Sequence, residues 1–240
     1  MCGRFVQHQS PRAYAEQFGV DPQAAPMPNA PPRFNAAPTN DLLVVRRHPE
    51  IGTRHLSLLR WGLVPSFASD PSAGARLINA RSETIAQKAS FAPAWRARRR
   101  CIVPADAFYE WPEGGKVRQP FLISRRDGRA LALAGLWEGW KDPASGAWLR
   151  TFAILTCAAA PGLARVHPRM PVILPEEAIA PYLEADDPRP LLRPLDDAAL
   201  ALWPVSAAVN SVRNDGAALM EPLDAGAAEA AWRLLGPGLA

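Results

Sequence analysis

The alternation of apolar and polar residues along the chain predicts a protein whose middle is dominated by β-strands. Short runs rich in β-branched and aromatic residues recur between turn-forming segments, which is typical of antiparallel strands. Two runs near the start read as strands of a meander, and a second set follows a polar loop over residues 65–76. The expected strands are 41–47, 55–61, 100–105, 107–111, 120–125, 131–140 and 151–157.

Helical patterns flank this strand-rich middle. Ser10 precedes Pro11, and Gly19 follows the next polar–apolar run, so we expect a helix that Ser10 caps and Gly19 ends. Residues 20–40 are rich in proline and are expected to be irregular. A short helix capped by Ser82 is expected next. This short helix covers residues 82–91, and two further helical patterns cover residues 175–184 and 225–235.

These elements predict an α+β fold, with a curved antiparallel or mixed β-sheet or barrel and flanking helices. Turns are expected at EGGK (113–116) and RDG (126–128). No linker interrupts the chain, so we expect a single domain over residues 1–240, with a core of about residues 2–222 and an acidic C-terminal helix. No apolar run has the roughly 18 residues of a membrane helix, and the start lacks a secretory signal pattern.

Charge is distributed unevenly along the chain. Residues 1–175 carry 23 Lys and Arg against 12 Asp and Glu, a net of +11, whereas residues 176–240 carry 4 against 11, a net of −7. A basic body favours an anionic partner, and 24 arginines against 3 lysines suit bidentate phosphate contacts. A gene of high GC content also encodes many arginines, so the charge alone does not identify the partner. The basic run at 96–100 is interpreted as a solvated face, with an auxiliary contact to an anionic partner as the alternative.

The cysteine pattern indicates a reduced compartment. Cys2, Cys101 and Cys157 form no CxxC pair, and the four histidines are scattered, so neither disulfides nor a metal site is expected. The strand patterns around Cys101 and Cys157 predict buried thiols. No glycine-rich phosphate loop is present, so no cofactor is expected. We therefore expect a cytoplasmic protein.

Cys2 has chemistry that a mid-chain cysteine lacks. Removal of Met1 would give Cys2 an α-amine and a thiol on adjacent carbons. The amine titrates at about 7.7–8.0, so part of it is a free nucleophile near neutrality. Such an amine attacks an aldehyde to give an imine, and the neighbouring thiol then closes a thiazolidine ring. Alone, however, Cys2 also fits an ordinary thiol near a chain end.

Seven segments accompany this cysteine in a specific order. They are MCGRF (1–5), NAAPT (35–39), WGLVP (61–65), NARSE (79–83), FYEWP (108–112), HPRMPVIL (167–174) and VNSVRNDG (209–216). The set resembles the SRAP (SOS response-associated peptidase) family from residue 1 to about 222. That resemblance implies a protein that recognises abasic sites in single-stranded DNA and links to them covalently through Cys2. It also implies removal of Met1, by the protein itself in one view of the family.

The resemblance implies roles for three further residues at the reactive centre. Glu110 matches the catalytic glutamate, and its apolar neighbours in AFYEW would raise its pKa and suit it to proton transfer. His167 matches a proton shuttle, since imidazole donates and accepts near pH 7. The family often carries Asp after this histidine, where this chain has Pro168. Asn79 would hold the sugar or the N-terminal group. A buried structural glutamate and a loop histidine remain the alternatives.

DNA contacts are implied on both sides of this centre. Arginines and a hydroxyl are candidates for the phosphates, and Arg81 has the alternative role of holding Glu83. Two tryptophans and a proline are candidates for stacking on bases, which is worth about 1–3 kcal/mol per base, although both tryptophans also fit a core. The implied DNA-binding residues are Arg4, Pro38, Trp61, Arg81, Trp111, Thr156 and Arg169. Phe67 stands near the place of a family tryptophan.

Other functions fit the first residues less well. N-terminal-nucleophile amidotransferases also begin Met-Cys-Gly, but they typically continue with Ile, where this chain has Arg4 and Phe5. A thiol peptidase that acts on other proteins would need Cys2 and His167 as a pair, and a cysteine at a chain end is an awkward protease nucleophile. Non-covalent binding of single strands is the remaining alternative, and only a test for a covalent adduct separates it from the implied function.

Overall fold

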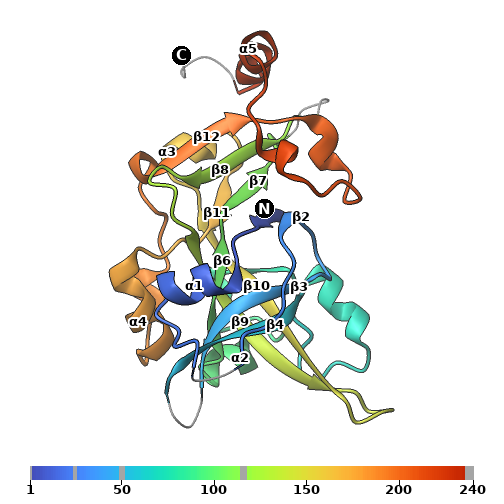
Figure 1. Ribbon diagram of the computed structural model, residues 1–240. Coiled ribbons are helices and arrows are strands. Elements are labelled where there is room, and N and C mark those ends of the chain that lie inside the picture. The colour runs from blue at the N-terminus through green and yellow to red at the C-terminus, as the bar shows by residue number, and fades with distance from the viewer. Residues whose placement is uncertain (1, 24–25, 49–51, 114–117, 236–240) are drawn as a thin grey trace.

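The computed structural model describes residues 2–23, 26–48, 52–113 and 118–235. Within these ranges the chain forms two sheets with helices around them (Figure 1). The α+β class and the barrel expected from the sequence are confirmed. None of the helices in these ranges combines the length and the apolar character that crossing a bilayer requires.

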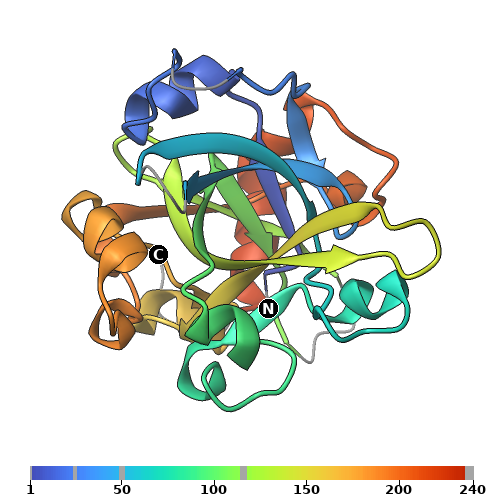
Figure 2. The ribbon, with the colours of Figure 1, turned by 90° about the horizontal axis from the view of Figure 1, so that it is seen from below.

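In the described ranges, a ring of strands closes into a barrel. Its members are β3 (Asp41–Arg47), β4 (Arg54–Trp61), β6 (Arg100–Ala105), β9 (Leu131–Lys141) and β10 (Trp148–Ala158). Antiparallel pairings run from β4 through β3, β6 and β9 to β10. A short parallel pairing of β4 with β10 then closes the ring, with Trp61 opposite Phe152. Figure 2 looks onto the lower end of the molecule, where the β9–β10 hairpin extends away from the body.

The second sheet lies beside the barrel and is antiparallel throughout. Its order is β12 (Leu200–Pro204), β8 (Phe121–Arg125), β7 (Ala107–Glu110), β1 (Arg4–Gln7) and β2 (Arg33–Ala36). Only Asp106 separates β6 of the barrel from β7 of this sheet. Two short strands, β5 (Asn79–Arg81) and β11 (Arg169–Pro171), extend β10 beyond the ring. These extensions bring residues from both halves of the chain toward β7.

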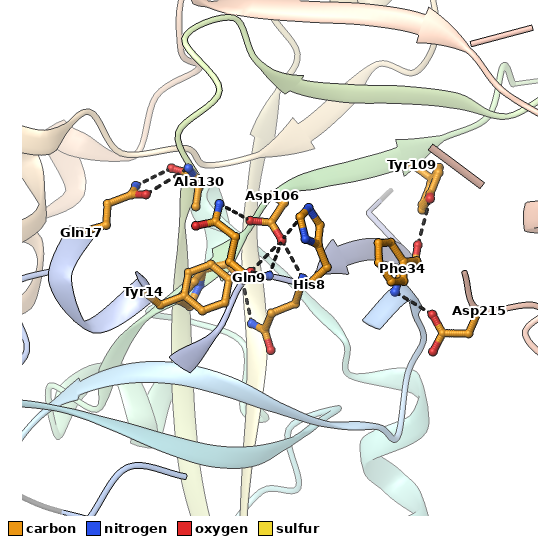
Figure 3. Close-up of polar contacts among 11 residues, drawn as sticks. His8, Gln9, Tyr14, Gln17, Phe34, Asp106, Tyr109, Ala130 and Asp215 are labelled. Carbon is orange, nitrogen blue, oxygen red and sulfur yellow. Dashed lines mark hydrogen bonds and ion pairs between the residues drawn. The ribbon is translucent and has the colours of Figure 1, made fainter. Parts of the chain in front are cut away.

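Asp106 holds the N-terminal segment at the junction of the two sheets (Figure 3). Its Oδ2 accepts from the backbone N–H of His8 at 2.6 Å and from the hydroxyl of Tyr14 at 2.7 Å. Its Oδ1 accepts from Nε2 of Gln9 at 2.8 Å. Because hydrogen bonds to a charged, mostly buried carboxylate are strong, Asp106 anchors the chain between β1 and the first helix.

Gln7 joins β1 to the barrel. Its side-chain Nε2 donates to the backbone carbonyls of Leu43 in β3 and Pro104 in β6, at 3.0 and 2.8 Å. Its Oε1 accepts from the backbone N–H of Leu43 at 2.8 Å. The amide is buried with its partners satisfied, so it fixes the position of β1 against two barrel strands.

Helices cover the outside of the sheets. They are α1 (Pro11–Gln17), α2 (Ala92–Arg96), α3 (Pro161–Ala164), α4 (Glu176–Glu184) and α5 (Ala225–Arg233). The expected cap of α1 is confirmed, since Ser10 Oγ accepts from the backbone N–H of Ala13 at 3.2 Å. Gly19 follows with φ of 63°, a left-handed conformation suited to glycine. α5 packs through Trp232, whose ring centroid lies 5.2 Å from that of Phe121.

The expected helix over residues 82–91 is wrong. Ser82–Thr84 forms a single 3₁₀ turn whose cap residue is Arg81, and α2 begins only at Ala92. Arg81 is still in β5, so the chain leaves a strand directly into the turn. Pro93 stands in the first turn of α2, the position where proline costs a helix least. Of the strands described, β1, β2, β5 and β12 were not expected, whereas the proline-flanked segment after His167 was expected to be a strand and contains β11.

The basic run at 96–100 is not a uniform solvated face. Arg100 is 3% exposed, and its guanidinium donates to the backbone carbonyls of Tyr182 at 3.0 Å and Ala185 at 2.5 Å. These carbonyls belong to the end of α4, where helical partners are missing. Arg98 and Arg99 form ion pairs with Asp186 and Glu138. The run therefore caps a helix and pairs with carboxylates.

Candidate functional site

Cys2 lies two residues before Arg4, the first residue of β1, and is fully buried. Arg4 of β1 opposes Tyr109 of β7, and this antiparallel register carries Cys2 toward the end of β7, where Glu110 lies. From the barrel side, Asn79 in β5 donates its Nδ2 to the backbone carbonyl oxygen of Cys2 at 2.7 Å. Residues from three distant parts of the chain therefore meet at Cys2.

Burial dominates the electrostatics of this centre. It raises the pKa of the Cys2 thiol, and the charge of Glu110 raises it further. Burial also raises the pKa of Glu110, which is 6% exposed, while His167 exerts an opposing effect on that pKa. A carboxyl whose pKa is raised exchanges a proton closer to neutrality than an ordinary glutamate does. The pair is thus a protonated thiol beside a potential acid–base group.

His167 lies between α3 and β11 and faces the same centre. Its Nδ1 lies 3.0 Å from the backbone nitrogen and 3.1 Å from the backbone oxygen of Arg169, so the tautomer decides which of the two groups it bonds. Nε2 lies 3.1 Å from a carboxylate oxygen of Glu113. The imidazole is therefore oriented from both sides, by the backbone at one nitrogen and by an exposed carboxylate at the other.

Arg169 is held at the edge of the centre by β10 and by the turn after β5. Its guanidinium makes two contacts of 3.0 Å with the carboxylate of Glu83. Its Nη2 also donates to the backbone carbonyl of Thr156 at 2.6 Å and to the hydroxyl at 3.2 Å. Thr156 is fully buried, so its hydroxyl positions Arg169, and the expected direct contact of Thr156 with DNA is not supported.

Arg4 and Trp111 contact the C-terminal loop over residues 207–216. Nη1 of Arg4 donates to Oδ1 of Asn35 and to the backbone carbonyl of Val209, both at 2.8 Å. Nε1 of Trp111 donates to Oδ1 of Asn210 at 2.7 Å. The Trp111 ring remains partly exposed, and the guanidinium carbon of Arg118 lies 5.9 Å from its centroid. This loop therefore forms one wall of the candidate site.

Trp61 does not lie where a base could stack on it. It is fully buried, with ring centroids 4.9 Å from Phe5 and 6.3 Å from Phe152. Its Nε1 donates to the backbone carbonyl of Ile78 at 3.0 Å. The expectation of a stacking role for Trp61 is corrected to a core role, because every polar and apolar part of the side chain is satisfied inside the protein.

Pro38, Arg81 and Phe67 lie at the surface to different degrees. Pro38 is half-buried and precedes Thr39, whose φ of 74° is rare for a residue with a Cβ. Arg81 is exposed at the end of β5, and Glu83 pairs with Arg169. Phe67 is 65% exposed in the loop after β4. Pro38 and Phe67 therefore present more accessible apolar surface than Trp61.

Sequence reasoning missed Glu113 and misassigned Glu83. Glu113 belongs to a segment interpreted only as a turn, and residues 114–116 of that turn lie outside the described residues. A carboxylate shortly after the Glu110 segment was the signal available for it. In the described ranges, no group of three or more His, Cys, Asp or Glu side chains is arranged to hold a metal ion. The buried Cys101 and Cys157 thiols agree with expectation.

Comparison with known proteins places the chain in a family. The family model described as "SOS response associated peptidase (SRAP)" matches residues 1–212. The Bacillus subtilis abasic site processing protein YoqW is 36% identical over 227 residues, covering 92% of this chain and 99% of the relative. The Escherichia coli abasic site processing protein YedK is 34% identical over 238 residues, covering 93% and 100%. The Gallus gallus abasic site processing protein HMCES is 34% identical over 228 residues, covering 81% and 67%.

Solved structures share the fold. A protein from Bacteroides thetaiotaomicron superimposes with a TM-score of 0.80 at 20% identity, covering 92% of this chain and all of that one. A protein from Bordetella bronchiseptica superimposes with a TM-score of 0.73 at 29% identity, covering 85% of this chain and 100% of that one. The arrangement of the barrel and the second sheet is thus shared with proteins of known structure.

Proposed function

This chain belongs to the SOS response associated peptidase (SRAP) family, and from that premise we propose that it processes abasic sites in single-stranded DNA by linking to them covalently through Cys2. The observation that carries the proposal is the placement of Cys2, which is held by Asn79 and lies within the field of Glu110. Relatives named abasic site processing proteins match almost the whole chain.

The reaction uses the amine and the thiol of Cys2 in sequence. Once Met1 is removed, the free α-amine attacks C1 of the ring-opened deoxyribose, which is an aldehyde. Loss of one water gives an imine. The thiol then adds across the carbon–nitrogen double bond: sulfur binds the carbon, the proton passes to nitrogen, and a thiazolidine results. Protein and DNA are joined with the net release of one water.

Two residues assist these proton movements, and a third holds the reacting groups in place. Glu110, with its raised pKa, donates a proton to open the sugar ring and to release water, and it accepts the thiol proton during ring closure. His167, oriented by Arg169 and Glu113, relays protons on the DNA side. Asn79 fixes the Cys2 carbonyl, which holds the amine and thiol in one orientation toward the aldehyde.

Removal of Met1 is part of the proposal. The thiol of Cys2 attacks the carbonyl carbon of the preceding peptide, the acyl group moves from nitrogen to sulfur, and water hydrolyses the thioester. Met is released and the α-amine is freed. Glu110 supplies the proton that the departing nitrogen needs. The protein then acts as a peptidase once, on itself, before it acts as a crosslinking enzyme.

Single-stranded DNA is the substrate that the surroundings of Cys2 suit best. Arg81 and Arg169 provide cations beside β5 and β11, and Trp111 with Arg118 provides a ring and a guanidinium on the opposite wall. Cations that track a backbone and rings that stack on bases are the common features of single-strand binding. We propose that the protein works as a cytoplasmic monomer at the nucleoid.

Intact-mass measurement tests the proposal. The wild type mixed with an abasic single-stranded oligonucleotide is expected to give a denaturant-resistant species whose mass is protein without Met1 plus DNA minus one water. Cys157→Ala, which removes another buried thiol, is the matched control and should behave as wild type. Cys2→Ser should give an adduct only after borohydride trapping, since an amine without a thiol stops at the imine. A stable unreduced adduct in Cys2→Ala would refute the linkage.

The same measurement tests Met1 removal. Wild type should lack Met1, whereas Glu110→Gln should retain it if the chain cleaves itself. Loss of Met1 in both proteins would assign that step to a cellular aminopeptidase. Loss of Met1 without any adduct on abasic DNA would favour a self-processing thiol peptidase that does not crosslink DNA.

A further inference from the structure

Arginine side chains gather around Trp137 at one end of the barrel. Arg46 of β3 opposes Cys101 of β6, and Cys101 opposes Gly135 of β9. Side chains two residues apart on a strand share a face, so Trp137 lies on the same face as Arg46. The guanidinium carbon of Arg46 lies 4.4 Å from the centroid of the Trp137 ring, and that of Arg99 lies 5.8 Å from it.

This face is the inside of the barrel. Phe152 opposes Trp137 across β9 and β10, and Trp61 opposes Phe152 across the closure of the ring. Phe152 and Trp61 are fully buried, whereas Trp137 is partly exposed. Arg150, two residues before Phe152, is exposed on the same face. Trp137 therefore marks the point where the packed interior opens to solvent, with Arg46, Arg99 and Arg150 around the opening.

Positive charge at this opening exceeds negative charge. Arg46 uses Nε and Nη2 to contact the hydroxyl of Ser57 at 3.3 and 2.9 Å, and Arg99 pairs with the buried carboxylate of Glu138. In the described ranges, neither Arg46 nor Arg150 forms an ion pair with a carboxylate. Burial lowers the pKa of Arg46 to about 10, with a smaller lowering from the charge of Arg150. A bound anion would relieve this repulsion.

The opening is separate from the Cys2 centre. β6 starts at Arg100, next to Arg99, and ends at Ala105, beside the Asp106 junction from which β7 continues to Glu110. At about 3.3 Å per residue, β6 spans roughly 17 Å between Arg100 and the Asp106 junction. In Figure 1 the helix α2 that precedes Arg99 lies at the lower end of the molecule, and β7 lies in the upper half.

We propose that this basic end of the barrel (Arg46, Arg99 and Arg150 around Trp137) is a second, non-covalent binding site for the phosphate backbone of single-stranded DNA. The identity of the polyanion rests on the proposed function. Guanidinium groups suit phosphate oxygens, and backbone phosphates carry no sequence information. A strand linked at Cys2 would therefore be held at a distance from the linkage, whatever its sequence.

The affinity for undamaged single-stranded DNA tests the basic end of the barrel, because this DNA has no abasic site to which the protein could crosslink. The variants are Arg150→Gln, which alters an exposed side chain, and the double variant Arg46→Gln/Arg150→Gln. Arg12→Gln on the outer face of α1 is the matched control, because it also removes one exposed positive charge. Fluorescence anisotropy is recorded with a long and a short labelled oligonucleotide at several salt concentrations.

For the long strand, the double variant is expected to bind about 10-fold more weakly, and the salt slope should fall by about 0.7 for each phosphate that the protein no longer neutralises. Arg150→Gln should give part of both effects, and Arg12→Gln little of either. Binding of the short strand at the Cys2 centre should be unchanged in all variants. An unchanged salt slope in Arg150→Gln, or an equal weakening in Arg12→Gln, would overturn the proposal.

The rate of crosslinking distinguishes a failure of this second binding site from a failure of the proposed crosslinking function. The rate of adduct formation with a short abasic oligonucleotide should be the same in wild type and in both variants. A wild type that forms no adduct contradicts the crosslinking function, while its anisotropy still reports on the basic end. Thermal unfolding shows whether the double variant folds; if it does not, the folded Arg150→Gln protein decides the result.

Discussion

The side-chain amide of Asn79 donates to the backbone carbonyl of Cys2 at 2.7 Å, so a strand that extends the barrel holds the residue that precedes β1. Asn79 stands on β5, which pairs with β10 in parallel, whereas Cys2 leads into the second sheet. The contact therefore sets the position of the reactive group relative to both sheets, and it is the geometric feature on which the proposed chemistry most directly depends.

Replacing Asn79 by Ala should slow crosslinking by about 10- to 100-fold, because the amine and thiol lose their fixed orientation. The free energy of unfolding should fall by only about 1 kcal/mol, the usual worth of one hydrogen bond. Single-turnover adduct formation on denaturing gels measures the rate. Gln17→Ala removes a similar amide contact, from Nε2 to the Ala130 carbonyl at 2.8 Å, and should crosslink at the wild-type rate. Equal rates for both variants would contradict the role of Asn79.

Glu110→Gln should make the protein more stable at neutral pH and less active. The folded pKa of Glu110 is raised by burial, so its contribution to stability is full below the unfolded pKa and is lost as pH rises through the folded pKa. Above that range the ionised group destabilises the fold, and its removal should raise the free energy of unfolding by about 1 kcal/mol. The crosslinking rate should fall by about 100-fold.

Urea unfolding of wild type and Glu110→Gln at acidic and at neutral pH checks the sign. The stability difference should be largest at neutral pH and vanish in acid. A variant that is less stable than wild type at neutral pH would show that ionised Glu110 stabilises the fold, contrary to the effect of its burial.

Asp106→Ala should be among the more destabilising single changes in this chain. It leaves the backbone of His8 and the hydroxyl of Tyr14 without their acceptor, and loss of hydrogen bonds to a mostly buried carboxylate should cost about 3 kcal/mol. Denaturant unfolding measures the cost, and Asp196→Ala, at an exposed cap, is the control. A loss below about 1 kcal/mol in Asp106→Ala would mean that α1 and β1 are held mainly by apolar packing.

Glu83→Gln should raise the affinity for undamaged single-stranded DNA several-fold. Hydrogen bonding to Arg169 holds the pKa of Glu83 below its usual range, so the pair adds stability above the unfolded pKa and loses it as pH falls. The Glu83 side chain is 51% exposed, which limits that contribution to less than about 1 kcal/mol. Removing the carboxylate frees Arg169 for phosphate. Glu176→Gln, which breaks the pair with Arg129, should leave DNA affinity unchanged.

The barrel strands could be predicted because each forms a long apolar run between clear turns. The bounds of β3 and β6 agree with the expected 41–47 and 100–105. β2 could not be predicted, since its four residues stand in a proline-rich segment. Distant contacts hold it in place: Asp215 accepts from the backbone N–H groups of Phe34 and Asn35 at 2.6 and 3.1 Å. No local pattern reveals such a partner.

In the candidate site, too, some residues could be predicted from the sequence and others could not. Cys2, Asn79 and Glu110 were expected from motif resemblance, and the structure brings them together, although their roles stay predictions. Trp61 was wrongly expected to stack on bases, because a tryptophan at a strand end has the same sequence signature in a core as at a surface. Its fully buried ring follows from the closure of β4 onto β10, a pairing between distant segments.

The interior position of β1 makes assembly of the reactive centre a late event in the life of the chain. Its neighbours in the sheet are β2 and β7, which end at residues 36 and 110, and His167 follows still later. Because these neighbours follow Cys2 in the chain, Cys2 acquires them only after the segments up to His167 have been made. If the proposed function holds, folding restricts the chemistry to the finished protein, because an unfolded chain carries Cys2 without Asn79, Glu110 and His167 beside it.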